Sequence, residues 1–316
     1  MRIGNLDFPR VICAPGTFGF FGEGYPFHKL LQFVPGYSSD IAFAAKTVTA
    51  YERKGNMPMR KDHITPLHIL PKCVYVDFFG GHVINAVGLT NKGIDWSMDQ
   101  MMWQKRKDNY FLSFMSIEPD LEKKLEELRY FCKAISVLNN SFALQINFAC
   151  PNTGQDPQAF LKMVIPMLEE ARKLTKVPLV ANFNPFVPIQ LLKEIQDKGL
   201  ADAFWIANTV PYGTQSEQAH HKFEKPIDWS IFDDTSPLLK RGLKQAGGLS
   251  SHLVLPYVIE TVKEAKNKGI TLPIIAGNGV QSKSAAIELQ KYADAIAIGT
   301  VFMLRPWLIK SILELS

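Results

Sequence analysis

The sequence is poor in the features that mark secreted, membrane-bound and zinc-dependent proteins. It has four cysteines in 316 residues, and no two of them form a Cys-x-x-Cys pair, so neither a disulfide framework nor a cysteine metal site is expected. No apolar run reaches the roughly 20 residues that a membrane-spanning helix needs. The apolar stretch near the start is short and interrupted by Asp7, Pro9 and Arg10, which does not suit a signal peptide. We therefore expect a cytoplasmic protein that has no metal site and no membrane anchor.

Strong charge of either sign is also missing. The formal net charge is only +5, and the basic residues are spread along the chain, so binding to nucleic acid is not expected. A mild basic excess does suit a protein that holds a phosphate group. Apolar residues make up 47 % of the chain, which is ordinary for a globular protein with a large buried core.

Short apolar runs rich in Ile, Val, Phe and Ala predict buried parallel strands, because they show little alternation of polar and apolar residues. They cover residues 41–48, 82–88, 110–117, 142–149, 178–184, 203–209, 272–278 and 295–300. Amphipathic helices are predicted at 121–135, 156–176, 188–199, 253–269 and 282–292, with Asp156 as an N-cap and Gly199 and Gly269 as C-terminal caps.

Eight strands that alternate with helices predict an α/β fold, a (β/α)8 TIM barrel in which residues 1–316 form a single domain. Residues 210–247 break this alternation, and we interpret them as a lid or active-site loop. In such a barrel, catalytic and binding residues lie where the strands end.

Two groups of residues occur at the predicted strand ends. Amide side chains donate and accept hydrogen bonds, so they suit a flat ligand with alternating carbonyl and N–H groups; they are Asn85, Asn147, Asn152, Asn182, Asn184 and Asn208. The last two strands end in glycines, whose backbone N–H groups can hold a phosphate; these are Gly277, Gly279 and Gly299, followed by Thr300, and Gly247–Gly248 can add further N–H groups.

Each feature alone also has an ordinary structural interpretation. An asparagine near a strand end is more often a turn former, and a lone cysteine is more often buried and inert. Lys46, in an apolar strand, is harder to explain in this way because unpaired buried lysines are rare. It is either functional or part of a salt bridge, and we favour a functional role.

Eight segments, taken together and in order, resemble the dihydroorotate dehydrogenase family across essentially the whole chain. They are APGTFGF (14–20), AAKTVT (44–49), INAVGLTNKG (84–93), INFACPNTG (146–154), ANT (207–209), GGLS (247–250), AGNGV (276–280) and IGT (298–300). The resemblance implies an FMN-dependent oxidation of dihydroorotate to orotate in pyrimidine biosynthesis. In that reaction a base removes a proton from C5 and a hydride passes from C6 to N5 of the flavin.

The resemblance also implies roles for individual residues. Cys150 matches the catalytic base, and a cysteine at this position fits the soluble class 1 enzymes. The residues that match substrate contacts are Asn85, Gly88, Leu89, Asn147, Asn152, Asn208 and Thr209. The residues that match cofactor contacts are Ala14, Gly16, Lys46, Thr47, Asn147, Asn182, Gly248, Gly279, Gly299 and Thr300.

The chain departs from the family pattern at Asn182, where the family has a lysine near N1 and O2 of the flavin. An amide keeps a hydrogen bond but supplies no charge, so we expect a lowered flavin potential and slow oxidation of dihydroorotate, or a different substrate. The alternatives are therefore an FMN enzyme acting on another cyclic amide or enone, and an FMN-binding homologue with weak or no activity. An aldolase that uses Lys46 as a Schiff base is a further, less favoured alternative.

The resemblance implies partners that the residues alone do not identify. A homodimer is expected, and class 1 enzymes pass electrons to fumarate, or to NAD through a separate FAD and iron–sulfur subunit. The chain itself has too few clustered cysteines to hold an iron–sulfur cluster.

Overall fold

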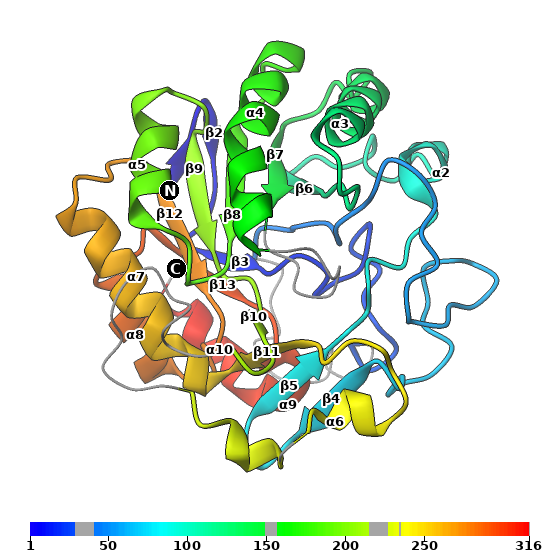
Figure 1. The fold of residues 1–316 in the computed structure, drawn as a ribbon, viewed down its shortest axis with the longest axis vertical. Coiled ribbons are helices and arrows are strands. Elements are labelled where there is room, and N and C mark those ends of the chain that lie inside the picture. Colours follow the sequence, from blue (N-terminus) through cyan, green and yellow to red (C-terminus); the bar gives the residue numbers. More distant parts are fainter. Residues whose placement is uncertain (29–40, 149–156, 215–226, 234, 316) are drawn as a thin grey trace.

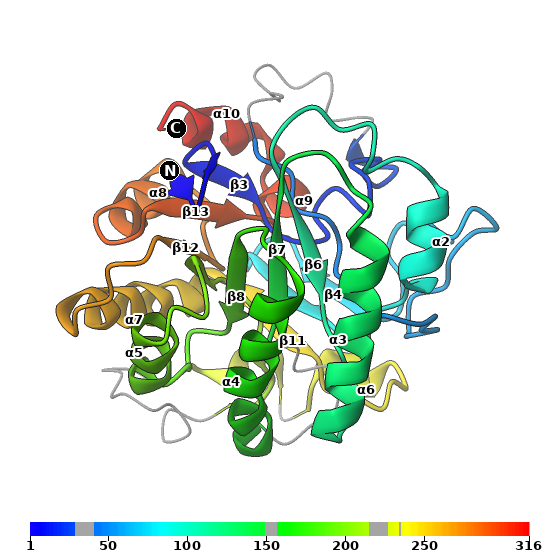
Figure 2. The same ribbon diagram turned by 90° about the horizontal axis from the view of Figure 1, so that it is seen from above.

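The computed structural model of the chain describes residues 1–28, 41–148, 157–214, 227–233 and 235–315. Its main element is a curled parallel sheet with the strand order β3-β13-β12-β9-β8-β7-β6. The strands are β3 (Val11–Cys13), β6 (Tyr110–Phe114), β7 (Phe142–Asn147), β8 (Leu179–Phe183), β9 (Ala203–Ile206), β12 (Ile274–Gly277) and β13 (Ala295–Ile298). Figures 1 and 2 show the helices packed around the outside of this sheet.

The segment after Ile41 occupies the gap between the two edge strands. Ala42 forms a parallel bridge with Ile12 of β3, and Ala44 forms another with Phe111 of β6. The segment therefore takes the remaining strand position, as predicted for residues 41–48, and the predicted TIM barrel is confirmed.

One predicted barrel strand was wrong. Residues 82–88 contain β5 (His82–Asn85), which pairs antiparallel with β4 (Val74–Asp77) and β11 (Gly248–Ser251). Together with β10 (Val210–Pro211), these strands form a separate four-stranded sheet with the order β10-β11-β5-β4. The first barrel strand is β3, which the sequence pattern did not identify.

All five predicted helices are present within a few residues of their expected bounds. They are α3 (Leu121–Ile135), α4 (Pro157–Leu174), α5 (Ile189–Asp197), α7 (Leu255–Asn267) and α8 (Lys283–Gln290). Gly199 and Gly269 follow α5 and α7 with φ angles of +64° and +85°, so both end a helix in the left-handed conformation as predicted. Asp156, the expected N-cap of α4, lies outside the described residues.

The smaller elements lie at the ends of the barrel and in the connections. They are β1 (Arg2–Ile3), β2 (Leu6–Asp7), α2 (Gly93–Asp99), η3 (Trp229–Phe232), α6 (Pro237–Lys240), η4 (His252–Val254), α9 (Val301–Leu304), η5 (Pro306–Leu308) and α10 (Ile309–Leu313). No helix in the described part of the chain is both long and apolar enough to cross a bilayer.

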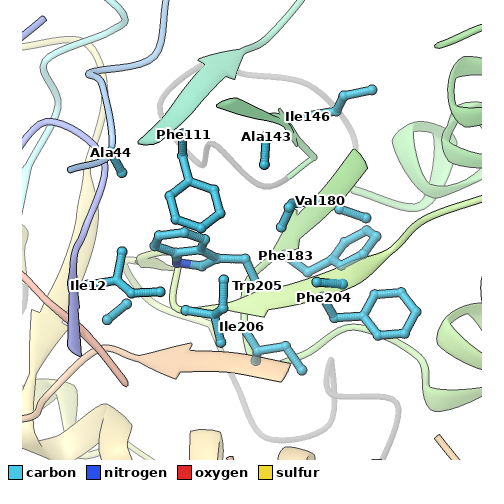
Figure 3. Close-up of a cluster of buried hydrophobic side chains, with 14 of the residues drawn as sticks. Ile12, Ala44, Phe111, Ala143, Ile146, Val180, Phe183, Phe204, Trp205 and Ile206 are labelled. Carbon is cyan, nitrogen blue, oxygen red and sulfur yellow. The ribbon is translucent and has the colours of Figure 1, made fainter. Parts of the chain in front are cut away.

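The barrel interior is closed by a plug of apolar side chains from several strands (Figure 3). Phe111 of β6 and Trp205 of β9 meet at its centre, with ring centroids 5.1 Å apart and planes at 85°. Ala143 of β7 and Val180 of β8 are fully buried beside them. Because side chains two residues apart on a strand point the same way, Ser113, Gln145 and Asn182 extend this interior toward the carboxyl ends of β6, β7 and β8.

Candidate functional site

A cavity of about 330 Å³ lies where the barrel strands end, and residues of the four-stranded sheet also line it. It brings together almost every predicted site residue that the structure describes. These are Ala14, Gly16, Lys46, Thr47, Asn85, Gly88, Leu89, Asn147, Asn182, Asn208, Thr209, Gly279, Gly299 and Thr300.

Three of the residues that the family resemblance assigns to catalysis, substrate or cofactor are not part of this group. Gly248 is buried at the start of β11, opposite Asn85, and does not line the cavity. Cys150 and Asn152 lie outside the described residues, so their positions stay predictions. Asn184, Gly247 and Gly277, which were named from their strand-end positions alone, do not line the cavity either. None of the described residues between Val210 and Gly247 lines the cavity either. The interpretation of that segment as a lid or active-site loop therefore gains no support.

The glycine turns after β12 and β13 form one end of the cavity. Gly279 has a φ of +89°, and a Cβ atom there would lie only 2.4 Å from the carbonyl oxygen of Ser251, so the turn requires glycine. Within the described part of the chain, the backbone N–H groups of Gly279, Gly299 and Thr300 have no hydrogen-bond acceptor. Free N–H groups gathered at one end of a cavity suit an anionic group such as a phosphate.

Lys46 supplies a positive charge to the cavity wall. Its Nζ lies 4.6 Å from the centre of the Phe20 ring, and no carboxylate of the described residues forms an ion pair with it. Burial lowers the pKa of Lys46 to about 8, although Glu23 and Cys73 act in the opposite direction. The salt-bridge interpretation of Lys46 thus finds no partner there, and an electron-rich ligand would stabilise the charged form.

The asparagines at the strand ends are held in fixed orientations. Asn208 donates from Nδ2 to Oδ1 of Asn147 over 2.8 Å, and its own Oδ1 accepts from the backbone N–H of Thr209 at 2.8 Å. Asn147 faces Asn182 in the register of β7 and β8. Asn85 reaches the same cavity from the end of β5. Amides from two sheets therefore converge on one space, where they can bind a ligand with both carbonyl and N–H groups.

Asn182 lies at one end of a series of buried, neutral polar side chains that are linked by hydrogen bonds. Ser113 Oγ donates to Gln145 Oε1 at 2.8 Å, and Thr47 Oγ1 lies 2.8 Å from the same serine oxygen. Asn182 donates from Nδ2 to Gln145 Oε1 over 3.4 Å. Two buried atoms of this series, Asn182 Oδ1 and Gln145 Nε2, have no partner. Asn182, where the family resemblance expects a lysine, is therefore held by uncharged groups.

Sequence reasoning did not identify Asn278 as a functional residue. It has a φ of +76°, and its side chain accepts from the N–H of Ser251 at 3.1 Å and donates to the carbonyls of Asn208 and Leu249 at 3.1 and 3.3 Å. Asn278 thus joins β11 to the loop after β9 beside the Gly279 turn. Its place between two glycines, in AGNGV, was a usable signal because asparagine tolerates the left-handed conformation.

Aromatic residues form another part of the wall that the sequence did not reveal. They include Tyr25, Phe27, His28 and Phe302. Tyr25 donates from its hydroxyl to the carbonyl of Gly16 over 2.9 Å, and burial lowers the pKa of His28 to about 4. His28 is therefore neutral near pH 7, and the cavity joins a flat apolar region to the polar strand ends.

Comparison with known proteins places the whole chain beside one group. A family model described as dihydroorotate dehydrogenase matches residues 2–315. The chain is 27 % identical over 312 residues to the dihydroorotate dehydrogenase B (NAD(+)) catalytic subunit of Carboxydothermus hydrogenoformans, covering 97 % of this chain and 87 % of that protein. Proteins of the same name from Bacillus cereus strain G9842 and Anoxybacillus flavithermus are also 27 % identical. Each alignment covers 96 % of this chain, with 85 % of the first protein and 84 % of the second.

Proposed function

Because the chain belongs to the dihydroorotate dehydrogenase family, we propose that it is an FMN-dependent enzyme that oxidises dihydroorotate to orotate. The observation that carries this proposal is the cavity itself. Apart from Gly248, every described residue that the sequence assigned to flavin or substrate lines this one space. Residues as distant in sequence as Ala14 and Thr300 meet there.

Two groups of residues that line the cavity support FMN as the cofactor. The unpaired N–H groups of Gly279, Gly299 and Thr300 would hold the phosphate, while Lys46 would supply a charge beside the ring system. Asn182 would face the N1 and O2 edge of the ring, and because both ring atoms are acceptors it would bind them through its amide N–H groups. When bound, FMN accepts the hydride, and the remaining tasks belong to the chain.

The substrate would lie over the flavin among the strand-end amides. Asn85, Asn147 and Asn208 offer donors and acceptors that match the carbonyl and N–H groups of a dihydropyrimidine, and Asn152 is proposed to join them. Cys150 is proposed to remove the C5 proton as a thiolate. Because a free thiol has a pKa of about 8.5, the fraction of active base rises as the pH approaches that value.

For the electron acceptor we propose NAD, reached through a separate FAD and iron–sulfur subunit. The support is that the relatives named above are described as NAD(+) enzymes and as catalytic subunits. A homodimer of this chain remains part of the proposal. The chain without such a partner should then reduce an artificial dye but not NAD.

A second candidate function follows from the neutral Asn182. Without a cation at this position, the reduced flavin loses a stabilising charge, which disfavours a demanding oxidation. Another cyclic amide or an enone is therefore the alternative substrate, to be tested as a panel beside dihydroorotate.

The decisive test is anaerobic bleaching of the purified, FMN-loaded protein. We expect dihydroorotate to remove the visible absorbance of the oxidised flavin, and we expect the rate to increase between roughly pH 6.5 and pH 8.5 as the thiol ionises. The Cys150→Ala variant should bind FMN equally well but bleach at least about a hundredfold more slowly. A wild-type flavin that dithionite reduces and dihydroorotate does not would refute the proposed substrate.

A further inference from the structure

The barrel layer above the apolar plug consists of four linked side chains without any charge. They lie on neighbouring strand positions of the barrel, and none is more than 6 % exposed. The order of contacts is Thr47, Ser113, Gln145 and Asn182. Only the two outer members, Thr47 and Asn182, line the cavity. The chain therefore connects one side of the cavity to the other through the barrel interior.

The donors and acceptors of this chain do not balance as they stand. Ser113 and Asn182 both donate to Gln145 Oε1, which leaves Gln145 Nε2 with two N–H groups and no acceptor. Asn182 Oδ1 meanwhile has no donor. Buried N–H groups without an acceptor are rare because their loss of water is not compensated.

If the side-chain amide groups of Gln145 and Asn182 each rotate by 180°, their nitrogen and oxygen atoms exchange places and a second hydrogen-bond arrangement results. Gln145 Nε2 then donates to Ser113 Oγ and to Asn182 Oδ1, and Ser113 donates onward to Thr47 Oγ1. Only one acceptor, Gln145 Oε1, is left unpaired, and Asn182 Nδ2 takes the position that Oδ1 held. The chain thus has two hydrogen-bond directions, in which Asn182 presents either an acceptor or a donor.

We propose that Gln145 is a positioning residue that reverses Asn182 between donor and acceptor, so that reduction of FMN in this protein takes up two protons instead of one. This inference rests on the proposed function, in which Asn182 faces N1 and O2 of the flavin. Oxidised flavin has only acceptors at that edge and needs Asn182 as a donor. Once reduced, N1 carries either a negative charge or a proton, and an amide oxygen binds the N1–H form.

The balance of the step is complete. Dihydroorotate gives two electrons and one hydrogen nucleus to N5 as a hydride from C6, and it loses a proton from C5. Bound FMN would take the hydride at N5, and a proton equivalent to the one released to Cys150 would reach N1 from solvent. Substrate and flavin therefore exchange two electrons and two hydrogens, and no net charge remains on the flavin ring.

The other titratable groups around the cavity define the pH range in which proton uptake by bound FMN can be measured. Lys46, Tyr25, His28 and His68 line it, and Glu23 and Cys73 influence Lys46. With a pKa of about 8 for Lys46 and about 4 for His28, Lys46 keeps at least roughly three-quarters of its charge and His28 stays neutral between roughly pH 6 and pH 7.5. His68 is exposed at the mouth, so the measurement is repeated in a His68→Gln background.

The midpoint potential of bound FMN counts the protons directly. For a two-electron couple a tenfold change in equilibrium constant is about 30 mV, so one proton gives a slope of about 30 mV per pH unit and two protons give about 59 mV. We expect the two-proton slope for the wild type and the one-proton slope for Asn182→Lys, whose cation would stabilise a charged N1. A one-proton slope in the wild type would mean that Lys46 already balances the charge, and it would overturn the inference.

The role of Gln145 is tested from the side away from the cavity. Ser113→Ala removes the hydroxyl that binds Gln145 but lines no part of the cavity. We expect oxidised FMN to bind roughly three- to tenfold more weakly, because Gln145 loses the acceptor that holds Asn182 as a donor. The affinity for reduced FMN should change less, so the potential should rise.

Ser97→Ala is the matched control for this variant. Ser97 is equally buried, and its hydroxyl donates to the carbonyl of Gly93 in α2 at 2.9 Å, outside the cavity lining. It should lower thermal stability without changing FMN affinity or potential. If Ser113→Ala behaves in the same way, Gln145 has only a structural role and the inference is wrong.

The outcome can be separated from that of the proposed function because dithionite replaces the substrate in these measurements. A two-proton slope in a protein that dihydroorotate cannot reduce would keep the inference and reject the substrate. A one-proton slope in a protein that dihydroorotate does reduce would do the reverse. Failure to bind FMN at all would reject both.

Discussion

Lys46 and Asn182 show how two polar residues at one cavity can be stabilised in different ways. Lys46 keeps a charge without a carboxylate partner among the described residues, and its lowered pKa reflects the cost of that burial. Asn182 carries no charge and is held by the hydrogen bond to Gln145. The charge of Lys46 is therefore only partly compensated, by Glu23 and the Phe20 ring, whereas Asn182 is held by the barrel interior.

The lowered pKa of Lys46 predicts opposite pH effects on the free protein and on FMN binding. The value of about 8 lies below the ordinary 10.5, so the unfolded chain binds the proton more tightly. This group therefore destabilises the free protein fully below pH 8, and the penalty is lost as the pH rises toward about 10.5. FMN affinity should instead be roughly constant between about pH 7, where the phosphate is mostly doubly ionised, and pH 8, and it should fall above pH 8 as the favourable charge disappears.

Fluorescence titration of FMN between pH 6 and pH 9.5 measures this effect. Lys46→Met has a similar length and no charge, so it should bind FMN more weakly at pH 7 and lose the decrease above pH 8. A Lys46→Met variant with the wild-type pH profile would show that another group controls binding.

At the scale of whole elements, the sequence predicted the helices better than the strands. The period of α3 and the glycines after α5 and α7 carry local signals that do not depend on distant partners. Strand partners are not local: three of the four residues of His82–Asn85 are buried, but the segment pairs antiparallel in a second sheet. Composition cannot show the direction of pairing, so this element was assigned to the wrong sheet.

The missed strand β3 has a related physical reason. It is only three residues long, and Pro9 and Pro15 stand on either side of it, so its apolar run is too short to separate from a loop. The site residues were easier to predict because motifs fix their order along the chain. The links that hold them, such as Asn278 to β11 and Gln145 to Asn182, depend on contacts between distant strands that a single sequence does not encode.

The end of β11 packs against the turn at Gly279, and we expect it to hold that turn in place. Ser251 accepts from the N–H of Leu253, contacts Nδ1 of His82 at 2.7 Å, and lies directly behind Gly279. Ser251→Ala should cost about 1–3 kcal/mol of unfolding free energy. It should also weaken FMN binding, because the Gly279 turn loses its support.

Ser236→Ala is the control for this effect. Ser236 is a fully buried cap of α6 that accepts from the N–H of Leu238 and donates to the carbonyl of Ala246, and it lines no part of the cavity. Its loss should reduce stability by a similar amount without changing FMN affinity. Equal FMN affinities for both variants in chemical denaturation and binding assays would argue against the support role of β11.

At the scale of the whole molecule, the first and the last strand of the barrel meet beside the cavity. The last barrel strand pairs with the first, with Ile296 opposite Val11, and Ala14 and Thr300 directly beyond them line the same space. A ligand bound there would contact residues that follow the first and the last barrel strand, and also residues of the four-stranded sheet. Ligand binding should therefore stabilise the molecule as a whole.

Riboflavin lacks the phosphate of FMN, so a comparison of the two ligands tests whether the glycine turns bind that phosphate. At a hundredfold excess over its Kd, FMN should add about 2.7 kcal/mol, or roughly 5 °C in Tm. Riboflavin at the same concentration should add clearly less, because the N–H groups of Gly279, Gly299 and Thr300 stay unpaired. Gly279→Ala places a Cβ atom 2.4 Å from Ser251 O at a φ of +89°, so it should reduce the FMN shift to the riboflavin level. Thermal melts with equal shifts for both ligands in the wild type would show that the glycine turns do not bind the phosphate.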